Sequence, residues 1–153
     1  MIICDSHAHL NHQGVFDRDR QAVLERAWQA GVGLILNVAT GLQDACPTVR
    51  EAERHPALLA AVGIHPHEAG QLDDTAMETL ERLSRSPEVV AWGEIGLDFH
   101  YLHAPVPVQE HAFARQLQMA ARLRLPVSVH TRVADEATLR LLRTHLGPAM
   151  GVI

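Results

Sequence analysis

Lysine is absent from this sequence of 153 residues, in which all 13 basic residues are arginines. Acidic residues outnumber them at 18, and the formal net charge is −5. Proteins that hold nucleic acid on a broad basic surface carry an excess of positive charge. The composition therefore argues against binding of that kind.

Cysteine and long apolar runs are also scarce. Two cysteines, Cys4 and Cys46, cannot form a disulfide framework, so a reducing cytoplasm is the expected compartment. No apolar run approaches the ~20 residues that span a bilayer. Met1 leads directly into Ile2 and Ile3 without a basic or hydrophobic leader. The sequence thus predicts neither a membrane span nor a secretory signal.

Apolar runs alternate with helical patterns along the chain. Strands are predicted at 2–4, 34–38, 58–64, 89–92 and 126–129, and residues 151–153 have the pattern of a sixth strand's start. Helices are predicted at 17–31, 47–55, 73–83, 109–123 and 134–146, with Pro47 in a first turn. This alternation indicates βα units on a parallel sheet, and the absence of a linker indicates one domain over 1–153.

Histidine is abundant at 11 residues, and imidazole is the commonest metal ligand. The carboxyl ends of parallel strands meet at one rim, where the connecting loops build sites. Seven candidate residues follow predicted strands: His7 and His9 the first, His65 and His67 the third, Glu94 and Asp98 the fourth, and His130 the fifth. We therefore expect a functional site at this rim.

Four of these residues have types and spacings that suit metal ligation. In an extended segment His7 and His9 point to the same side and can face one ion. Glu94 lies among glycines and apolar residues, where a charge needs a partner, and a carboxylate can bridge two divalent ions ~3.5–4 Å apart. His130 ends a core strand, either as a ligand or as a buried histidine bonded to backbone.

Asp98, His65 and Arg132 each have more than one interpretation. Asp98 is interpreted as a partner that orients a ligand, or as a turn residue, in preference to a direct ligand. His65, in preference to His67, is expected to contact substrate, the alternative being a role in ordering the loop. The planar guanidinium of Arg132 suits a phosphate or carboxylate, or a salt bridge at the rim. Cys4 is expected to be a small core residue.

Four ordered segments resemble the TatD family of metal-dependent deoxyribonucleases: Asp-Ser-His-Ala-His-Leu at 5–10, Gly-Ile-His-Pro-His at 63–67, Gly-Glu-Ile-Gly-Leu-Asp-Phe at 93–99, and Leu-Pro-Val-Ser-Val-His-Thr-Arg at 125–132. Gln109, Phe113, Gln116 and Ala120 match the family pattern too. The resemblance covers essentially the whole chain. It implies a (β/α)₈ TIM-barrel type of fold in the amidohydrolase superfamily, a cytoplasmic location, and hydrolysis of nucleic-acid phosphodiesters, often as an exonuclease.

The resemblance also implies roles for individual residues. By motif, His7 and His9 bind one of two divalent ions (Mg²⁺, Mn²⁺ or Zn²⁺), Glu94 bridges both as the catalytic carboxylate, and His130 binds the second. Some superfamily relatives bridge their metals with a carboxylated lysine, which this chain lacks. His65 and Arg132 are then expected to hold the scissile phosphate.

The chain departs from the family pattern beyond its fifth helix. The family has Gly-Val-x-His-Cys-Phe-Ser-Gly on the sixth strand and Thr-Asp-x-Pro on the eighth, which supply a further ligand histidine and a proton-accepting aspartate. Gly151, Val152 and Ile153 match only the start of the former. We therefore expect an incomplete barrel of five βα units plus the start of a sixth strand, the N-terminal portion of a TatD-like hydrolase, with weak or no activity.

Two alternatives to a nuclease stay open. One is a related amidohydrolase acting on a small ester, amide or lactone, and the other is a non-catalytic metal-binding fragment. For a nuclease, DNA is the expected partner. Because the chain has no lysine and a net charge of −5, affinity would come from the ions and a few arginines, without sequence specificity.

Overall fold

The computed structural model describes residues 2–12, 14–147 and 150–153. The strands are β1 (Ile3–Ala8), β2 (Val32–Val38), β3 (Leu58–Val62), β4 (Val89–Asp98) and β5 (Val127–Arg132). The α-helices are α1 (Arg20–Gln29), α2 (Leu42–Ala52), α3 (Asp74–Leu83), α4 (Val106–Leu123) and α5 (Asp135–His145), and a short 3₁₀-helix, η1 (Pro66–Gln71), precedes α3. Among the residues described, no helix is both long and apolar enough to cross a bilayer.

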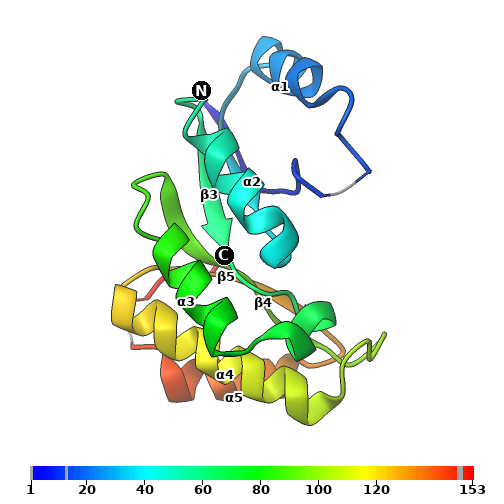
Figure 1. The fold of residues 1–153 in the computed structure, drawn as a ribbon, viewed down its shortest axis with the longest axis vertical. Coiled ribbons are helices and arrows are strands. Elements are labelled where there is room, and N and C mark those ends of the chain that lie inside the picture. The colour runs from blue at the N-terminus through cyan, green and yellow to red at the C-terminus, as the bar shows by residue number, and fades with distance from the viewer. Residues whose placement is uncertain (1, 13, 148–149) are drawn as a thin grey trace.

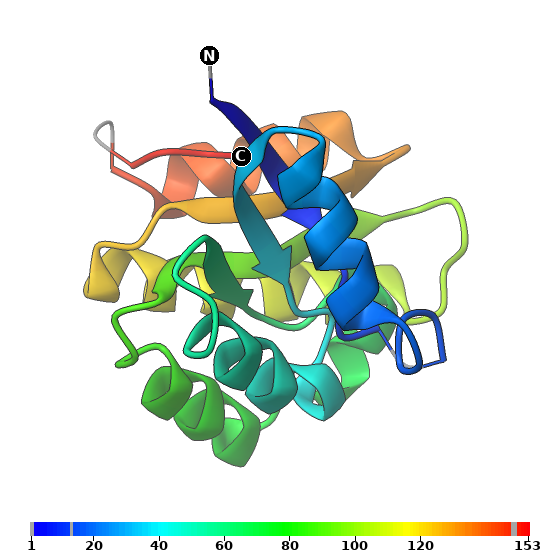
Figure 2. The same ribbon diagram turned by 90° about the horizontal axis from the view of Figure 1, so that it is seen from above.

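The five strands form one parallel sheet in the order β1-β2-β3-β4-β5. Each parallel pair needs a crossover connection, which the helix between the two strands supplies. The helices follow one another in chain order, with α1 and α5 at opposite ends of the molecule (Figure 1), and the view from above shows the curvature of the sheet (Figure 2). The predicted α/β architecture is confirmed as a curled half-barrel.

The last residues of the chain lie alongside β5. Val152 forms a parallel bridge with Val127, and the amide of Ile153 donates to the Val127 carbonyl over 2.8 Å. The amide of Val129 in turn donates to the Ile153 carbonyl over 3.0 Å. The expected start of a sixth strand is therefore present, as a short bridge.

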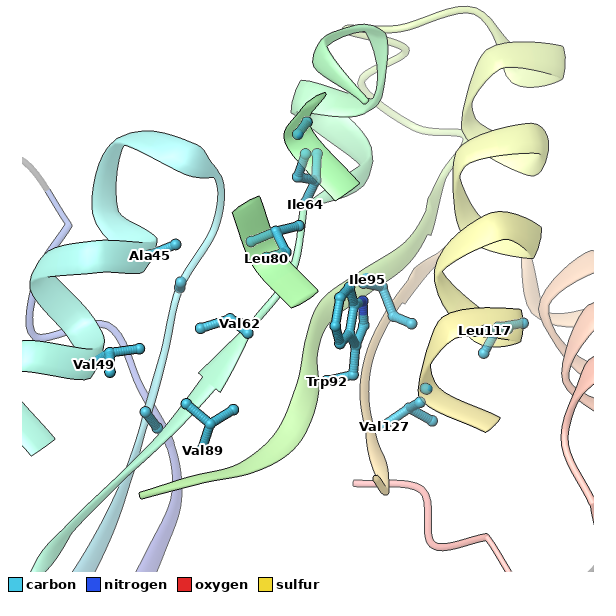
Figure 3. Packing of buried hydrophobic residues seen from close by; sticks show 14 of the residues in the cluster. Ala45, Val49, Val62, Ile64, Leu80, Val89, Trp92, Ile95, Leu117 and Val127 are labelled. Atoms are coloured by element: carbon cyan, nitrogen blue, oxygen red, sulfur yellow. The ribbon is translucent and has the colours of Figure 1, made fainter. Parts of the chain in front are cut away.

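Apolar side chains from strands and helices meet in one large core. On one side, Ala45 and Val49 of α2 lie near Val62 of β3, and on the other Trp92 of β4 lies near Leu117 of α4 (Figure 3). The indole of Trp92 is fully buried and its Nε1–H donates to Oε1 of Gln116 over 3.3 Å. Burial of large side chains on this scale is the main stabilising contribution to the sheet and its helical cover.

Helix α2 begins earlier than the sequence predicts. The carboxylate of Asp44 accepts from the backbone amides of Thr40 and Gly41, each over 3.0 Å, and this fixes the first turn at Leu42. Pro47 therefore lies inside the helix instead of in its first turn, where it forgoes one backbone hydrogen bond. The prediction for Pro47 is wrong because the capping contacts of Asp44 start the helix at Leu42, ahead of the proline.

Strands β1, β4 and β5 extend beyond their predicted ends, so His7, Glu94 and His130 lie within strands instead of after them. Glycine and polar residues interrupt the apolar pattern there and conceal the strand continuation from sequence reasoning. The prediction of Cys4 as a core residue is also wrong, since its side chain is exposed. It lies on β1, which pairs only with β2 among the strands described.

Glycines allow β4 to approach its neighbours closely. A Cβ at Gly93 would lie 2.7 Å from the Cβ of Ser128 on β5, and one at Gly96 would overlap the carbonyl oxygen of His130. Gly96 also has a φ of +142°, a backbone conformation that residues other than glycine rarely adopt. These two positions bring the polar residues of β4 and β5 together.

We predict that Gly96→Ala lowers the free energy of unfolding by about 3 kcal/mol, because it adds both backbone strain and an overlap with β5. Urea denaturation followed by tryptophan fluorescence measures the change. Gly70→Ala is the matched control, since a Cβ at Gly70 meets nothing within 4 Å. Equal stability of the two variants would contradict the role assigned to Gly96.

Candidate metal centre

Four histidines from three strand ends surround the carboxylate of Glu94. The Nε2 atoms of His7 and His9 each lie 3.4 Å from its Oε2. On the other side, Nδ1 of His130 lies 3.3 Å and Nε2 of His65 3.9 Å from its Oε1. The parallel register brings these residues, distant in sequence, to the same rim.

The spacing of these atoms matches that of ligands around an ion. Two sets of residues, His7-His9-Glu94 and His65-Glu94-His130, can each hold an ion. Within each set the ligand atoms all lie within 4.8 Å of one another. Two ligand atoms that are each about 2.1 Å from one tetrahedral ion lie about 3.4 Å apart. The separations from Glu94 to His7, His9 and His130 are close to this value and longer than the ~2.9 Å typical of direct hydrogen bonds. The residues present therefore fit a divalent cation on each side of Glu94.

Hydrogen bonds on the far side of the rings orient two of the histidines as ligands. The Nδ1–H of His9 donates to the Val38 carbonyl over 2.8 Å, since a carbonyl can only accept. The Nε2–H of His130 donates to Oδ2 of Asp98 over 3.1 Å for the same reason. In the neutral ring the other nitrogen then carries the lone pair, and in both residues this nitrogen faces Glu94.

His65 has the opposite tautomer. Its Nδ1 accepts a hydrogen bond from the His67 amide over 3.1 Å, so a neutral ring carries its proton on Nε2. Burial lowers the pKa of His65 to about 4, against the opposing influence of Glu94. At neutral pH His65 therefore presents an uncharged N–H donor to the centre. The rings of His9 and His130 present lone pairs only in their neutral form, and in their protonated form they donate to Glu94.

The ionised form of Glu94 is strongly favoured by its neighbours. Burial alone raises the pKa of this carboxyl, but the imidazoles of His130, His7 and His9 hold it well below its ordinary range. Reciprocally, the Glu94 carboxylate raises the pKa of His9 and of His130, although burial acts in the opposite direction. The carboxylate is thus ionised at neutral pH.

Asp98 lies behind His130 and outside both sets of three. It is fully buried, and its Oδ2 accepts from Nε2 of His130 and, over 2.8 Å, from Nε2 of His67. Its Oδ1 accepts from the amides of His100 and Tyr101, each over 2.9 Å. Burial acts to raise its pKa, but the Tyr101 amide and the two imidazoles keep it below the usual range. This geometry fixes the ring of His130.

Arg132 lies on the same rim, two residues beyond His130. Its side chain is exposed, and the guanidinium carbon is 4.5 Å from the centre of the Tyr101 ring. Within the described ranges its guanidinium makes neither a hydrogen bond nor an ion pair with protein groups. The salt bridge considered from the sequence is therefore not formed by these residues.

Two glutamines position the strand ends and were noted from the sequence only as part of a family pattern. The Gln109 side chain accepts from the Asp98 amide over 2.8 Å and donates to the Asp98 carbonyl over 2.9 Å. Gln116 bonds both backbone groups of Ile64 in the same way. Both lie on the buried face of α4, where an amide side chain among apolar residues is the signal of such a role.

A pocket of about 470 Å³ opens beside the centre. It is lined by His9, His12, Val15, Phe16, Thr40, Gln43, His65, His67, Glu68 and Glu94. Three residues of the candidate metal centre, His9, His65 and Glu94, thus line an open pocket together with apolar and amide side chains.

Comparison with known proteins supports a common ancestry. A family model described as TatD related DNase matches residues 4–153. The chain is similar to the 3'-5' ssDNA/RNA exonuclease TatD of Cronobacter turicensis, with 39% identity over 138 residues, which cover 90% of this chain and 52% of that protein. The Salmonella typhimurium protein of the same name is 38% identical over 138 residues, covering 90% and 53%. The chain spans about half the length of these curated relatives.

Two crystal structures share the fold. A TatD homologue from Escherichia coli has a TM-score of 0.86 and 34% identity, covering 94% of this chain and 56% of that one. A TatD-family hydrolase from Entamoeba histolytica has a TM-score of 0.85 with 22% identity and 54% of its chain covered, a likeness of fold alone. These findings confirm the resemblance inferred from the four sequence motifs and the barrel type.

We predict that Glu94→Gln lowers the pKa values of His9 and His130 in metal-free protein, because it removes the anion that stabilises their protonated rings. Histidine pKa values measured by NMR titration test this. Glu78→Gln, which neutralises an exposed carboxylate on α3, is the control and should shift neither. Unchanged values in Glu94→Gln would show that Glu94 is not their main electrostatic partner.

Proposed function

We propose that this chain, which belongs to the TatD-related DNase family, carries the first half of an active site. The proposed activity is that of a divalent-metal-dependent phosphodiesterase acting on nucleic acid. The matched relatives are named 3'-5' ssDNA/RNA exonucleases, so an exonuclease is the proposed form of this activity. The observation that carries the proposal is Glu94, a buried carboxylate with histidine nitrogens at ligand spacing on both of its oxygens.

In this proposal His7, His9 and Glu94 hold one cation, and Glu94 and His130 hold the second. Two divalent ions, as Mg²⁺, Mn²⁺ or Zn²⁺, supply Lewis acidity toward the phosphoryl oxygens and activate the attacking water. Glu94 keeps its charge because the surrounding imidazoles hold its pKa low. Asp98 keeps the His130 ring turned so that Nδ1 faces Glu94.

The phosphate contacts are assigned to His65 and Arg132. The uncharged Nε2–H of His65 can donate to a phosphate oxygen without adding a second full charge beside the histidines. The exposed guanidinium of Arg132 has N–H groups that suit phosphate geometry. The proposed substrate is nucleic acid without sequence preference, with DNA favoured over RNA.

The proposed location is the cytoplasm. Cys4 and Cys46 are both free thiols in the structure, which suits a reducing compartment.

We predict two bound Mn²⁺ or Zn²⁺ ions per chain, measured by isothermal titration calorimetry. Glu94→Ala should lose both, because both sets share this carboxylate, and His130→Ala should lose one. His65→Ala should retain both, since its Nε2 is a donor and not a ligand. His111→Ala, an exposed histidine of α4, is the control and should bind like the parent protein. Loss of one ion in His65→Ala would reassign this residue as a ligand.

We predict that any hydrolysis by the chain with added Mn²⁺ favours bis(p-nitrophenyl) phosphate over p-nitrophenyl acetate, and that Glu94→Ala lowers the phosphodiester rate by about 100-fold or more. A spectrophotometric assay of released p-nitrophenol measures both rates. A preference for the neutral ester would instead favour the alternative amidohydrolase, and saturable metal binding without turnover would favour a metal-binding fragment.

A further inference from the structure

Tyr101 is an exposed aromatic residue at the rim of the metal centre. It is the one tyrosine of the sequence, it lies in the loop between β4 and α4, and 52% of it is accessible to solvent. Aromatic residues make up only 4% of this chain. A large ring left exposed beside a polar centre therefore calls for an explanation other than core packing.

The loop holds Tyr101 in a defined position. Its amide donates to Oδ1 of Asp98, the carboxylate that also receives the His130 ring. Its ring meets that of His67 edge-on, with the planes at 89° and the centres 5.7 Å apart. The hydrogen-bond network that orients a proposed metal ligand thus also holds the Tyr101 backbone, and the His67 ring packs against the exposed side chain.

Arg132 completes this arrangement from the neighbouring strand. Its guanidinium stacks on the Tyr101 ring at 4.5 Å from the ring centre, a cation–π contact between residues 31 positions apart. A stacked guanidinium keeps the N–H groups at its edge, and in the described part of the chain no protein acceptor uses them. An exposed, fixed cation with unused donors suits a phosphate group.

We propose that Tyr101 and Arg132 form a nucleotide subsite at the scissile position, in which Tyr101 stacks on an unpaired base and Arg132 binds the scissile phosphate that this nucleotide carries. The subsite rests on the proposed function, because it places the base of this nucleotide next to the phosphate that His65 and Arg132 are proposed to hold. Every base has a π-face, so stacking gives affinity without sequence preference. In a duplex those faces are covered by neighbouring bases, so the subsite selects single strands.

This subsite supplies an affinity that the composition otherwise lacks. The chain has no lysine and a net charge of −5, so a broad electrostatic surface cannot hold a polynucleotide. One stacked base and one guanidinium–phosphate contact provide a short-range alternative. The contact of Arg132 with the Tyr101 ring leaves the charge of the guanidinium available to a phosphate. A carboxylate in place of the ring would neutralise that charge.

The test is the affinity of the full 153-residue chain for a fluorescein-labelled oligo(dT) decamer, measured by fluorescence anisotropy with Ca²⁺ as the cation. Tyr101→Ala should raise Kd about 5- to 100-fold, the range for loss of one stacked base. Tyr101→Phe, which keeps the ring, should bind within about 2-fold of the parent. Arg132→Lys keeps the charge but loses the planar stack, and should raise Kd about 2- to 5-fold.

Two controls separate stacking from a loss of loop order. Leu139→Ala removes an apolar side chain of similar exposure on α5 and should not alter Kd. A decamer with abasic positions should bind the parent and Tyr101→Ala equally, because no base remains to stack. An equal loss for both decamers, or no loss in Tyr101→Ala, would overturn the subsite.

The two proposals fail in different ways. Base-dependent binding by a chain that binds no Mn²⁺ or Zn²⁺ in the calorimetric titration would leave the subsite standing and overturn the proposed function. Hydrolysis of bis(p-nitrophenyl) phosphate together with base-independent binding would leave the proposed function standing and overturn the subsite.

Discussion

The carboxylate of Glu94 is a buried charge, and the polar residues of the rim are arranged around it. Only 6% of the residue is accessible, and an isolated ion so placed costs several kcal/mol. Imidazole nitrogens 3.3–3.9 Å from its two oxygens compensate this cost in the metal-free chain. A divalent cation on each side would do so more completely, which is why the same geometry that stabilises the anion also suits a metal centre.

The scaffold provides this arrangement through backbone contacts more than through the ligands themselves. Gly93 and Gly96 let β4 lie against β5, so that Glu94 and His130 come within 3.3 Å. Gln109 holds both backbone groups of Asp98, and Asp98 holds the His130 ring. The helix α4 thus acts on the site through a buried amide, a carboxylate and an imidazole in series.

Much of this could be predicted from the sequence, because the signals are local. The alternation of apolar runs and helical patterns predicted the βα order, and polar residues after apolar runs predicted the rim. Strand ends were predicted poorly, since Gly93, Glu94 and Gly96 interrupt the apolar pattern while β4 continues to Asp98. The prediction that Pro47 lies in a first turn was wrong, because the helix start depends on the capping contacts of Asp44. These contacts leave no mark in the pattern of apolar residues.

By itself, the sequence determined the residue types at the strand ends and the order in which they occur, since both follow from local periodicity and motif. The tertiary structure alone decided how they act. It turned Nε2 of His9 toward the centre, because Nδ1 of that ring donates to the Val38 carbonyl on β2, 29 positions away in the chain. It also stacked Arg132 on Tyr101, since strand register brings together residues that no local pattern connects.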